Sequence, residues 1–224
     1  MGENRERRRA RRQPRGLLRK DEILAAAGTL FAEVGYDKAT TNLIAAQAGV
    51  SPGSLYQFFP NKEAIAHAYA AAATAQLQRV YDTILSPEVI ALPLPSFLDV
   101  FIDALVAFNR AFPGYLALSV ASTISSPLGL ALADLRRGIM GRLDALFEAR
   151  WPAMPSKERR LRGLVSYRLF LALLPLALEG PEDDREAVVG EMKAVLFRYW
   201  EPSTGGEPPA DMPASGPPAP SAPW

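Results

Sequence analysis

The stretch from Thr40 to Ile65, TTNLIAAQAGVSPGSLYQFFPNKEAI, most constrains what this chain can fold into. Thr40 can cap a first helix, and Gly49 stands where a left-handed residue ends it. Ser51 and Pro52 can start a second helix, with serine as the cap and proline at the first helical position. Two short helices joined by a tight turn containing glycine are the spacing of a DNA-binding helix-turn-helix. That spacing alone fits a plain helical corner equally well, so other residues have to decide.

A longer pattern decides between these two interpretations. From Ile44 to Glu63 the residues read I-A-x-x-A-G-V-S-x-G-x-L-Y-x-F-F-x-N-K-E, which resembles the signature of the TetR/AcrR family of bacterial transcriptional regulators. The resemblance extends upstream through Ile23-Leu24, Ala26-Ala27, Leu30-Phe31 and Gly35-Tyr36, and it covers residues 19–69. Gln57-Phe58 departs from the residues that members often carry there, which leaves the base preference open.

The resemblance implies an all-α protein in two parts, an N-terminal three-helix helix-turn-helix DNA-binding domain and a C-terminal helical ligand-binding and dimerisation domain. It further implies a homodimer that binds an inverted-repeat operator in double-stranded DNA. We expect a disordered basic arm at 1–16, the DNA-binding domain at 17–64, the helical domain at 65–200 and a disordered Pro-rich tail at 201–224.

The second short helix carries residue types that suit DNA. Its N-terminal N–H groups can bind a phosphate, and Gly53 lets the backbone approach closely. Ser54 and Gln57 can reach base edges, since glutamine pairs well with adenine. The family resemblance implies phosphate contacts for Thr40, Tyr56 and Lys62, although Tyr56 also fits a half-buried aromatic and Lys62 a solvated charge. The predicted DNA-binding residues are Thr40, Thr41, Gln47, Ser51, Pro52, Gly53, Ser54, Tyr56, Gln57 and Lys62.

The charge is distributed unevenly along the chain. Residues 1–20 carry a net charge of +7, whereas residues 21–200 and 201–224 carry −3 each. A basic arm beside the helix-turn-helix suits attraction to phosphates or insertion into a minor groove. An unstructured solubilising tail is the alternative interpretation of this arm.

The rest of the chain reads as amphipathic helices. We expect them at residues 62–85, 96–112, 115–123, 128–150, 156–178 and 184–200, with a proline-punctuated connection at 86–95. The last two carry large apolar stripes, which in the TetR/AcrR family pair into a four-helix bundle between two subunits. The alternative is that these stripes cover the core of a monomer.

The middle helices are expected to enclose a small-molecule effector. Asn109 is a polar amide among apolar residues, so it either satisfies a buried backbone group or awaits a ligand. The predicted ligand-binding residues are Phe101, Leu105, Phe108, Asn109, Phe112, Tyr115, Met140, Tyr167 and Phe170. An aromatic stripe of this kind also fits an ordinary helical core.

Several other kinds of function find no support in the sequence. The chain has no cysteine and one histidine, His67, so a Cys/His metal cluster is excluded. We find no Gly-rich phosphate loop and no nucleophile paired with a base, and we therefore expect no catalytic residue, metal or cofactor. Residues 111–133 are uncharged, but Pro113-Gly114 and Pro127 interrupt them, which argues against a membrane span. Together with the lack of cysteine, this suits a cytoplasmic protein.

These observations favour a DNA-binding transcriptional regulator, a repressor released from its operator by a small apolar ligand. The alternative is a helical small-molecule-binding or protein-interaction module that does not read DNA. The basic arm beside the helix-turn-helix favours the regulator.

Overall fold

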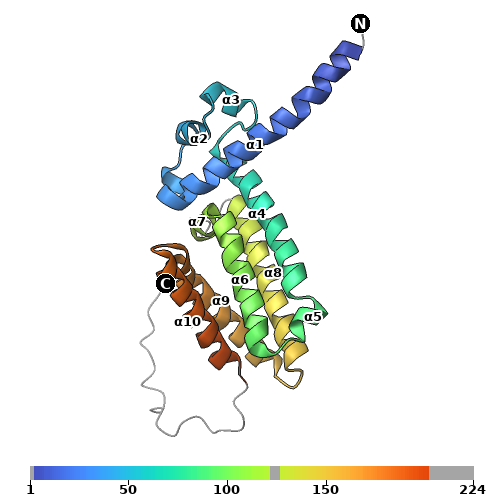
Figure 1. Ribbon diagram of the computed structural model, residues 1–224, viewed down its shortest axis with the longest axis vertical. Coiled ribbons are helices and arrows are strands. Elements are labelled where there is room, and N and C mark those ends of the chain that lie inside the picture. Colours follow the sequence, from blue (N-terminus) through green and yellow to red (C-terminus); the bar gives the residue numbers. More distant parts are fainter. Residues whose placement is uncertain (1–2, 122–126, 202–224) are drawn as a thin grey trace.

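The computed structural model describes residues 3–121 and 127–201, and it describes side chains at 18–118 and 136–201. All regular elements in these residues are helices, as the sequence predicts (Figure 1). They are α1 (Glu3–Lys38), α2 (Thr41–Gln47), α3 (Pro52–Tyr56), α4 (Lys62–Ile84), α5 (Pro87–Ile90), α6 (Leu94–Ala111), α7 (Gly114–Ala121), α8 (Pro127–Arg150), α9 (Ser156–Leu178) and α10 (Glu182–Trp200).

The helices form two parts that share α4. Helices α1, α2 and α3 gather at one end of the molecule, and α4 runs from them into a bundle with α6 and α8 (Figure 1). Helices α9 and α10 pack together as a pair, α9 against α8 and α10 against α6. The TetR-type arrangement of a helix-turn-helix part and a helical C-terminal part is therefore confirmed.

The N-terminal helices begin and end where local sequence signals place them. The side chains of Thr40 and Ser51 cap α2 and α3, as expected, and the side chain of Asn61 caps α4. Gly49 lies in the turn between α2 and α3 with φ of 63°, a conformation that favours glycine. Gly35 breaks the helical backbone of α1 with φ of 80° and ψ of 161°, so a kink separates the last residues of α1 from the rest of the helix.

Two segments differ from the expectation. Helix α1 begins at Glu3, so the structure has helix where a disordered arm was expected; arginine, glutamate and alanine are all good helix formers. The proline-punctuated connection contains the short helix α5, capped by the Ser86 hydroxyl and started by Pro87. The same Ser-Pro pair starts α3 at Ser51-Pro52, so Ser86-Pro87 was the sequence signal that could have predicted α5. The predicted Pro-rich tail lies outside the described residues, apart from its first residue, Glu201.

One continuous core runs through both parts of the molecule. Its lower end centres on Trp200, which is fully buried and has its indole edge-on to Phe147, with ring centroids 4.9 Å apart. The indole N–H donates to the Ser166 hydroxyl at 2.7 Å, and that hydroxyl donates to the Arg162 carbonyl at 2.7 Å. Every polar group of this small network therefore has a partner, as a buried site requires.

The stripe expected for dimerisation on the last helix divides between two environments. Met192 and Leu196 are 1% and 3% exposed, so these two residues belong to the core of one chain. The exposed apolar residues lie on α9 instead. Leu161, Leu164 and Leu176 are 58%, 45% and 56% exposed, and the 3.6-residue repeat places all three on one face of that helix.

Helix α9 is also long and apolar enough to cross a membrane by length and composition alone. Its first two turns carry Lys157, Glu158, Arg159, Arg160 and Arg162. Helices α8 and α10 pack against it within the chain. We therefore interpret its apolar surface as a packing face of a globular domain.

Candidate DNA interface and effector domain

The α2–α3 surface is built on two serine or threonine caps. The Leu43 N–H donates to the Thr40 hydroxyl oxygen at 3.2 Å, and the Ser54 N–H donates to the Ser51 hydroxyl oxygen at 3.1 Å. Both hydroxyls act as acceptors in these bonds, so each keeps its own proton to donate outward. Each cap can therefore hold its helix and also bind an anion.

A hydrogen bond joins the first turn of α2 to the last residue of α3. The hydroxyls of Thr41 and Tyr56 lie 3.0 Å apart, and either can be the donor. Tyr56 is 51% exposed, although it follows the fully buried Leu55. The buried neighbour fixes the end of α3, and the bond to Thr41 fixes the direction of the exposed ring.

The predicted DNA-binding residues lie on or beside α2 and α3, with Lys62 at the start of α4. The buried side chains of Ile44, Ala45 and Leu55 hold α2 against α3. Seven of the ten are exposed, namely Thr40, Gln47, Ser51, Pro52, Gly53, Tyr56 and Gln57. The other three, Thr41, Ser54 and Lys62, are half-buried. Their contact with DNA remains a prediction.

Gly53 is not required by the fold of the chain. A Cβ atom added there would meet nothing within 4 Å, and the backbone does not have a positive φ. The described part of the chain therefore gives no reason for a glycine at this position. A closely approaching DNA backbone would supply such a reason.

Lys62 has a structural role that the sequence analysis missed. Its ammonium donates to the Tyr36 carbonyl at 2.8 Å and to the Asp37 carbonyl at 3.3 Å. The same group lies 4.3 Å from the centre of the Tyr36 ring. Lys62 thus ties the start of α4 to the end of α1, and two of its three donors are already used. The predicted phosphate contact remains a prediction for its third donor.

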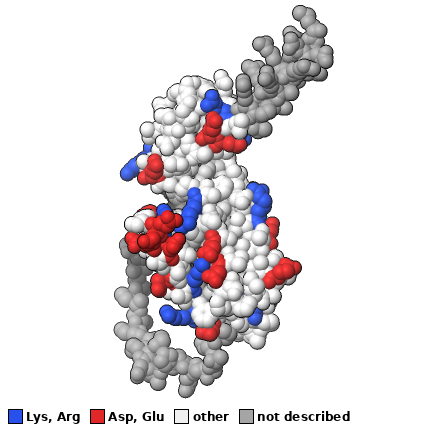
Figure 2. All heavy atoms as spheres, in the orientation of Figure 1, with Lys and Arg blue, Asp and Glu red and all other residues white. Residues whose placement is uncertain are grey.

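The segment Thr40–Asn61 carries no charged residue. Figure 2 shows few charged side chains on the visible face of this end, whereas both signs are mixed over the C-terminal part. Within this segment only helix N–H groups and hydroxyls can attract phosphate, and positive charge comes from flanking residues such as Lys62 and the basic N-terminal segment.

A tight crossing joins the DNA-binding end to the C-terminal part. A Cβ atom on Gly114, at the start of α7, would lie 2.5 Å from the carbonyl oxygen of Gly28 in α1. A Cβ atom on Gly28 would overlap the ring of Tyr69 in α4. The Tyr69 hydroxyl accepts a hydrogen bond from the Gly114 N–H at 3.1 Å. Three helices thus meet at a point where no side chain fits between them.

The predicted ligand-binding residues fall into separate groups. Phe108, Phe112 and Tyr115 form an aromatic cluster, with Phe108 centred 5.2 Å from Phe112 and 5.3 Å from Tyr115. Phe112 continues this cluster to Tyr69 at 6.0 Å. Phe101 lies elsewhere, stacked on Phe97 at 5.3 Å and near Trp200 at 6.0 Å.

The remaining predicted residues are buried or half-buried core. The Asn109 side-chain amide donates to the Leu105 carbonyl at 2.8 Å, one turn back in the same helix. Of the two interpretations of Asn109, this bond supports the one in which the amide satisfies a buried backbone group. Met140, Tyr167 and Phe170 pack against the core from α8 and α9.

Tyr81, Tyr115 and Tyr167 bring phenol groups from α4, α7 and α9 into one region. Burial raises the pKa of Tyr81 and of Tyr115, and the neighbouring Tyr167 raises both further. Arg142 lies over the Tyr81 ring at 5.4 Å and opposes the rise at Tyr81. The sequence analysis missed Tyr81 as a candidate because it follows the apolar stripe of α4.

Comparison with known proteins covers both parts of the chain. The family model described as "Bacterial regulatory proteins, tetR family" matches residues 23–69. The model described as "Tetracyclin repressor-like, C-terminal domain" matches residues 93–199. Together the two matched segments span more than half of the chain.

Individual relatives agree with these matches. The HTH-type transcriptional regulator YhgD of Bacillus subtilis (strain 168) is 23% identical over 185 residues, covering 80% of this chain and 95% of YhgD. The fatty acid degradation regulator FadR from Bacillus halodurans has a similar fold, with a TM-score of 0.60 and 21% identity over 80% of this chain and 94% of FadR.

A TetR-like transcriptional regulator from Rhodococcus sp. RHA1 has a TM-score of 0.64 with 14% identity, over 81% of this chain and 93% of that one. The helix-turn-helix geometry, the C-terminal helices and the two family matches lead to one conclusion. The chain belongs to the TetR family and is a DNA-binding transcriptional regulator.

Proposed function

We propose that this regulator is a homodimeric repressor that binds an inverted-repeat operator and is released from it by a small apolar ligand. The observation that carries the DNA-binding part is the α2–α3 surface, where the Thr41–Tyr56 hydrogen bond and two capping hydroxyls lie over a buried support. Phosphates are bound at Thr40, Ser51 and Tyr56, and bases are read by Ser54 and Gln57.

The dimer forms through the exposed apolar face of α9. Leu161, Leu164 and Leu176 lie on it, and the small, exposed Ala172 between them allows a partner helix to approach closely. A short reading helix makes few base contacts, so two copies related by a two-fold axis supply the missing specificity. Covering this face also removes the exposed leucines from water.

The effector binds in the region of Phe108, Tyr115 and Tyr167. The ligand is mostly apolar, because aromatic rings dominate this region, and phenol groups supply its few polar contacts. Movement there reaches the DNA-binding end through α4 and through the crossing of α1 and α7 at Gly28 and Gly114. A coupling of about 1–3 kcal/mol would weaken operator binding about 5- to 150-fold. We place the regulator in the cytoplasm, where the operator DNA and the ligand meet.

Footprinting on DNA that flanks the regulator's own gene tests the operator. The expected result is a protected inverted repeat with half-sites about 34–36 Å apart or a related spacing.

Deleting residues 1–16 removes seven arginines and should make the salt dependence of operator binding shallower. The slope of log affinity against log salt concentration should fall by about 0.9 for each lost phosphate contact.

Two glycine variants give a matched control. Gly53→Ala should abolish protection, whereas Gly190→Ala should leave it unchanged; an added Cβ at either site meets no atom of this chain within 4 Å. Equal protection by both variants would show that DNA does not approach Gly53. Protection by neither would point to an effect on folding, which thermal melting of the two variants detects.

A further inference from the structure

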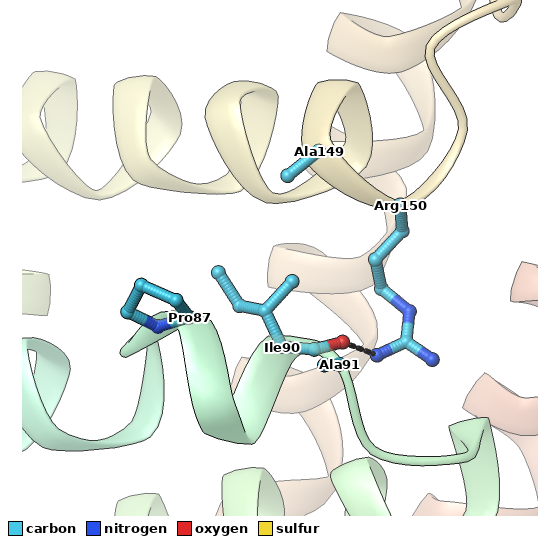
Figure 3. Close-up of a pocket in the computed structure, with 5 residues that line it drawn as sticks. All are labelled: Pro87, Ile90, Ala91, Ala149 and Arg150. Atoms are coloured by element: carbon cyan, nitrogen blue, oxygen red, sulfur yellow. Dashed lines mark hydrogen bonds between the residues drawn. The ribbon is translucent and has the colours of Figure 1, made fainter.

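A cleft lies at the opposite end of the C-terminal part from the helix-turn-helix, between α5 and the end of α8 (Figure 1). Its volume is about 530 Å³, it opens to solvent, and it is lined by Pro87, Ile90, Ala91, Ala149 and Arg150. Figure 3 shows the side chains of Pro87 and Ile90 pointing from α5 toward Ala149 on α8. The volume falls within the range of small-ligand sites.

Arg150 is the polar residue of this cleft. Its guanidinium donates from Nη1 to the Ile90 carbonyl at 2.5 Å (Figure 3). The same guanidinium donates from Nη2 to the Leu92 carbonyl at 3.0 Å. It also lies 4.8 Å from the centre of the Phe97 ring. Two of its five N–H groups are used in this way, and three remain.

No carboxylate pairs with Arg150 within the described side chains, residues 18–118 and 136–201. Some other partly buried cations of this part have carboxylate partners, whereas Arg142 and Arg185 pair with no carboxylate among the described side chains. Arg159 pairs with Asp144 and Glu148, and Lys193 pairs with Asp99 and Asp103. Carbonyl groups orient the Arg150 guanidinium but do not neutralise its charge. A partly buried charge without a counter-ion is costly, and an anion in the cleft would lower that cost.

We propose that this cleft binds a small monocarboxylate with an apolar tail. The carboxylate accepts from the remaining N–H groups of Arg150, since a guanidinium matches that planar group with two parallel bonds. The tail lies along Pro87, Ile90 and Ala149. A single cation favours a single negative charge, and the exposed Glu88 on α5 disfavours a dianion.

This site is separate from the aromatic effector region, and the inference does not depend on the proposed repressor function. Calorimetric titration of the full chain with octanoate tests it directly. We expect one octanoate per chain, with 1-octanol, which keeps the tail and lacks the charge, binding at least tenfold more weakly.

Two variants change the site in different ways. Arg150→Met removes the charge, and Ala149→Phe fills the cleft from an exposed helix position without touching the guanidinium. Each should weaken octanoate binding at least tenfold. Arg79→Met removes an exposed arginine from α4 and should change the affinity less than twofold.

The proposal is overturned if Ala149→Phe binds octanoate as tightly as the unaltered chain, or if 1-octanol binds as tightly as octanoate. It is also overturned if Tyr167→Ala abolishes binding while Ala149→Phe does not, because octanoate would then occupy the aromatic region. Arg150→Met removes two hydrogen bonds of the fold, and if that variant fails to fold, octanoate binding by Ala149→Phe decides the question alone.

Discussion

The helix starts of the DNA-binding end and the packing of the C-terminal part depend on hydrogen bonds of very different sequence range. At the DNA-binding end, the capping bonds of Thr40, Ser51 and Asn61 each reach a residue three positions away. In the C-terminal part, Trp200 bonds to Ser166 across 34 positions and Lys193 to Asp103 across 90. A local surface can be read from sequence and can be altered piece by piece, whereas the C-terminal part depends on contacts that only the complete fold creates.

The largest expected effect is in the C-terminal core. Leu196→Asp would place an unpaired carboxylate at a position only 3% exposed, which should cost about 3–5 kcal/mol of unfolding free energy. Leu164→Asp, on the exposed face of α9, should leave the fold of the chain intact and yield monomers. Urea denaturation and sedimentation separate the two effects. Similar stability loss in both variants would contradict the assignment of these two faces.

Tyr69→Phe tests the crossing that joins the two parts. The variant keeps the ring but leaves the buried Gly114 N–H without its acceptor, which should cost about 1–3 kcal/mol in denaturant unfolding. Tyr56→Phe serves as the control, because its hydroxyl bond is exposed and its loss should change stability by less than about 0.5 kcal/mol. Equal stability of the two variants would mean that Tyr69 does not stabilise the junction.

The same variant should alter stability in alkali. Burial raises the pKa of Tyr69 and the hydrogen bond from Gly114 lowers it by less, so the pKa moves from 10.0 to about 12. Between these two pH values the unfolded tyrosine ionises while the folded one stays neutral, so stability falls as pH rises. Removing the hydroxyl should make this decline shallower. A decline equally steep in Tyr69→Phe would assign it to other groups, such as Tyr81 and Tyr115.

A helix cap should contribute less to stability than the buried contacts of Leu196 and Tyr69. Ser51→Ala removes the acceptor for the Ser54 N–H and should cost about 1 kcal/mol. Ser86→Ala, at the matching Ser-Pro start of α5, is the comparison. Its bond is longer, at 3.4 Å, so its loss should cost less. Thermal unfolding measures both variants, and a larger loss at Ser86 would reverse the ranking.

Features that depend on local bonds could be predicted from the sequence, and features that depend on long-range packing could not. Thr40, Ser51 and Pro52 marked helix starts correctly, because a cap bonds to residues that are close to it in sequence. The apolar stripe of the last helix was expected at a dimer face, yet Leu196 on that helix is buried in the core of its own chain, because an apolar stripe does not reveal which neighbour covers it. Phe101 was grouped with Phe108 because both lie on one apolar stripe of α6. In the structure, however, Phe101 packs near Trp200 instead.

The crossing of Gly28, Tyr69 and Gly114 could not be predicted for the same reason. Each residue is unremarked in its own helix, and only the packing of three helices gives it a role. Lys62 shows the converse, since a charge that reads as a phosphate contact also holds two carbonyls of α1.

Operator affinity of Tyr56→Phe tests the central claim most directly. The change removes one exposed hydroxyl oxygen, which bonds Thr41 across the α2–α3 surface, and leaves the buried Leu55 beside it untouched. If this surface binds DNA, affinity for the footprinted operator should fall at least tenfold at constant salt while the melting temperature stays the same. Unchanged affinity with unchanged melting would contradict the claim that the Thr41–Tyr56 hydroxyl pair contacts DNA.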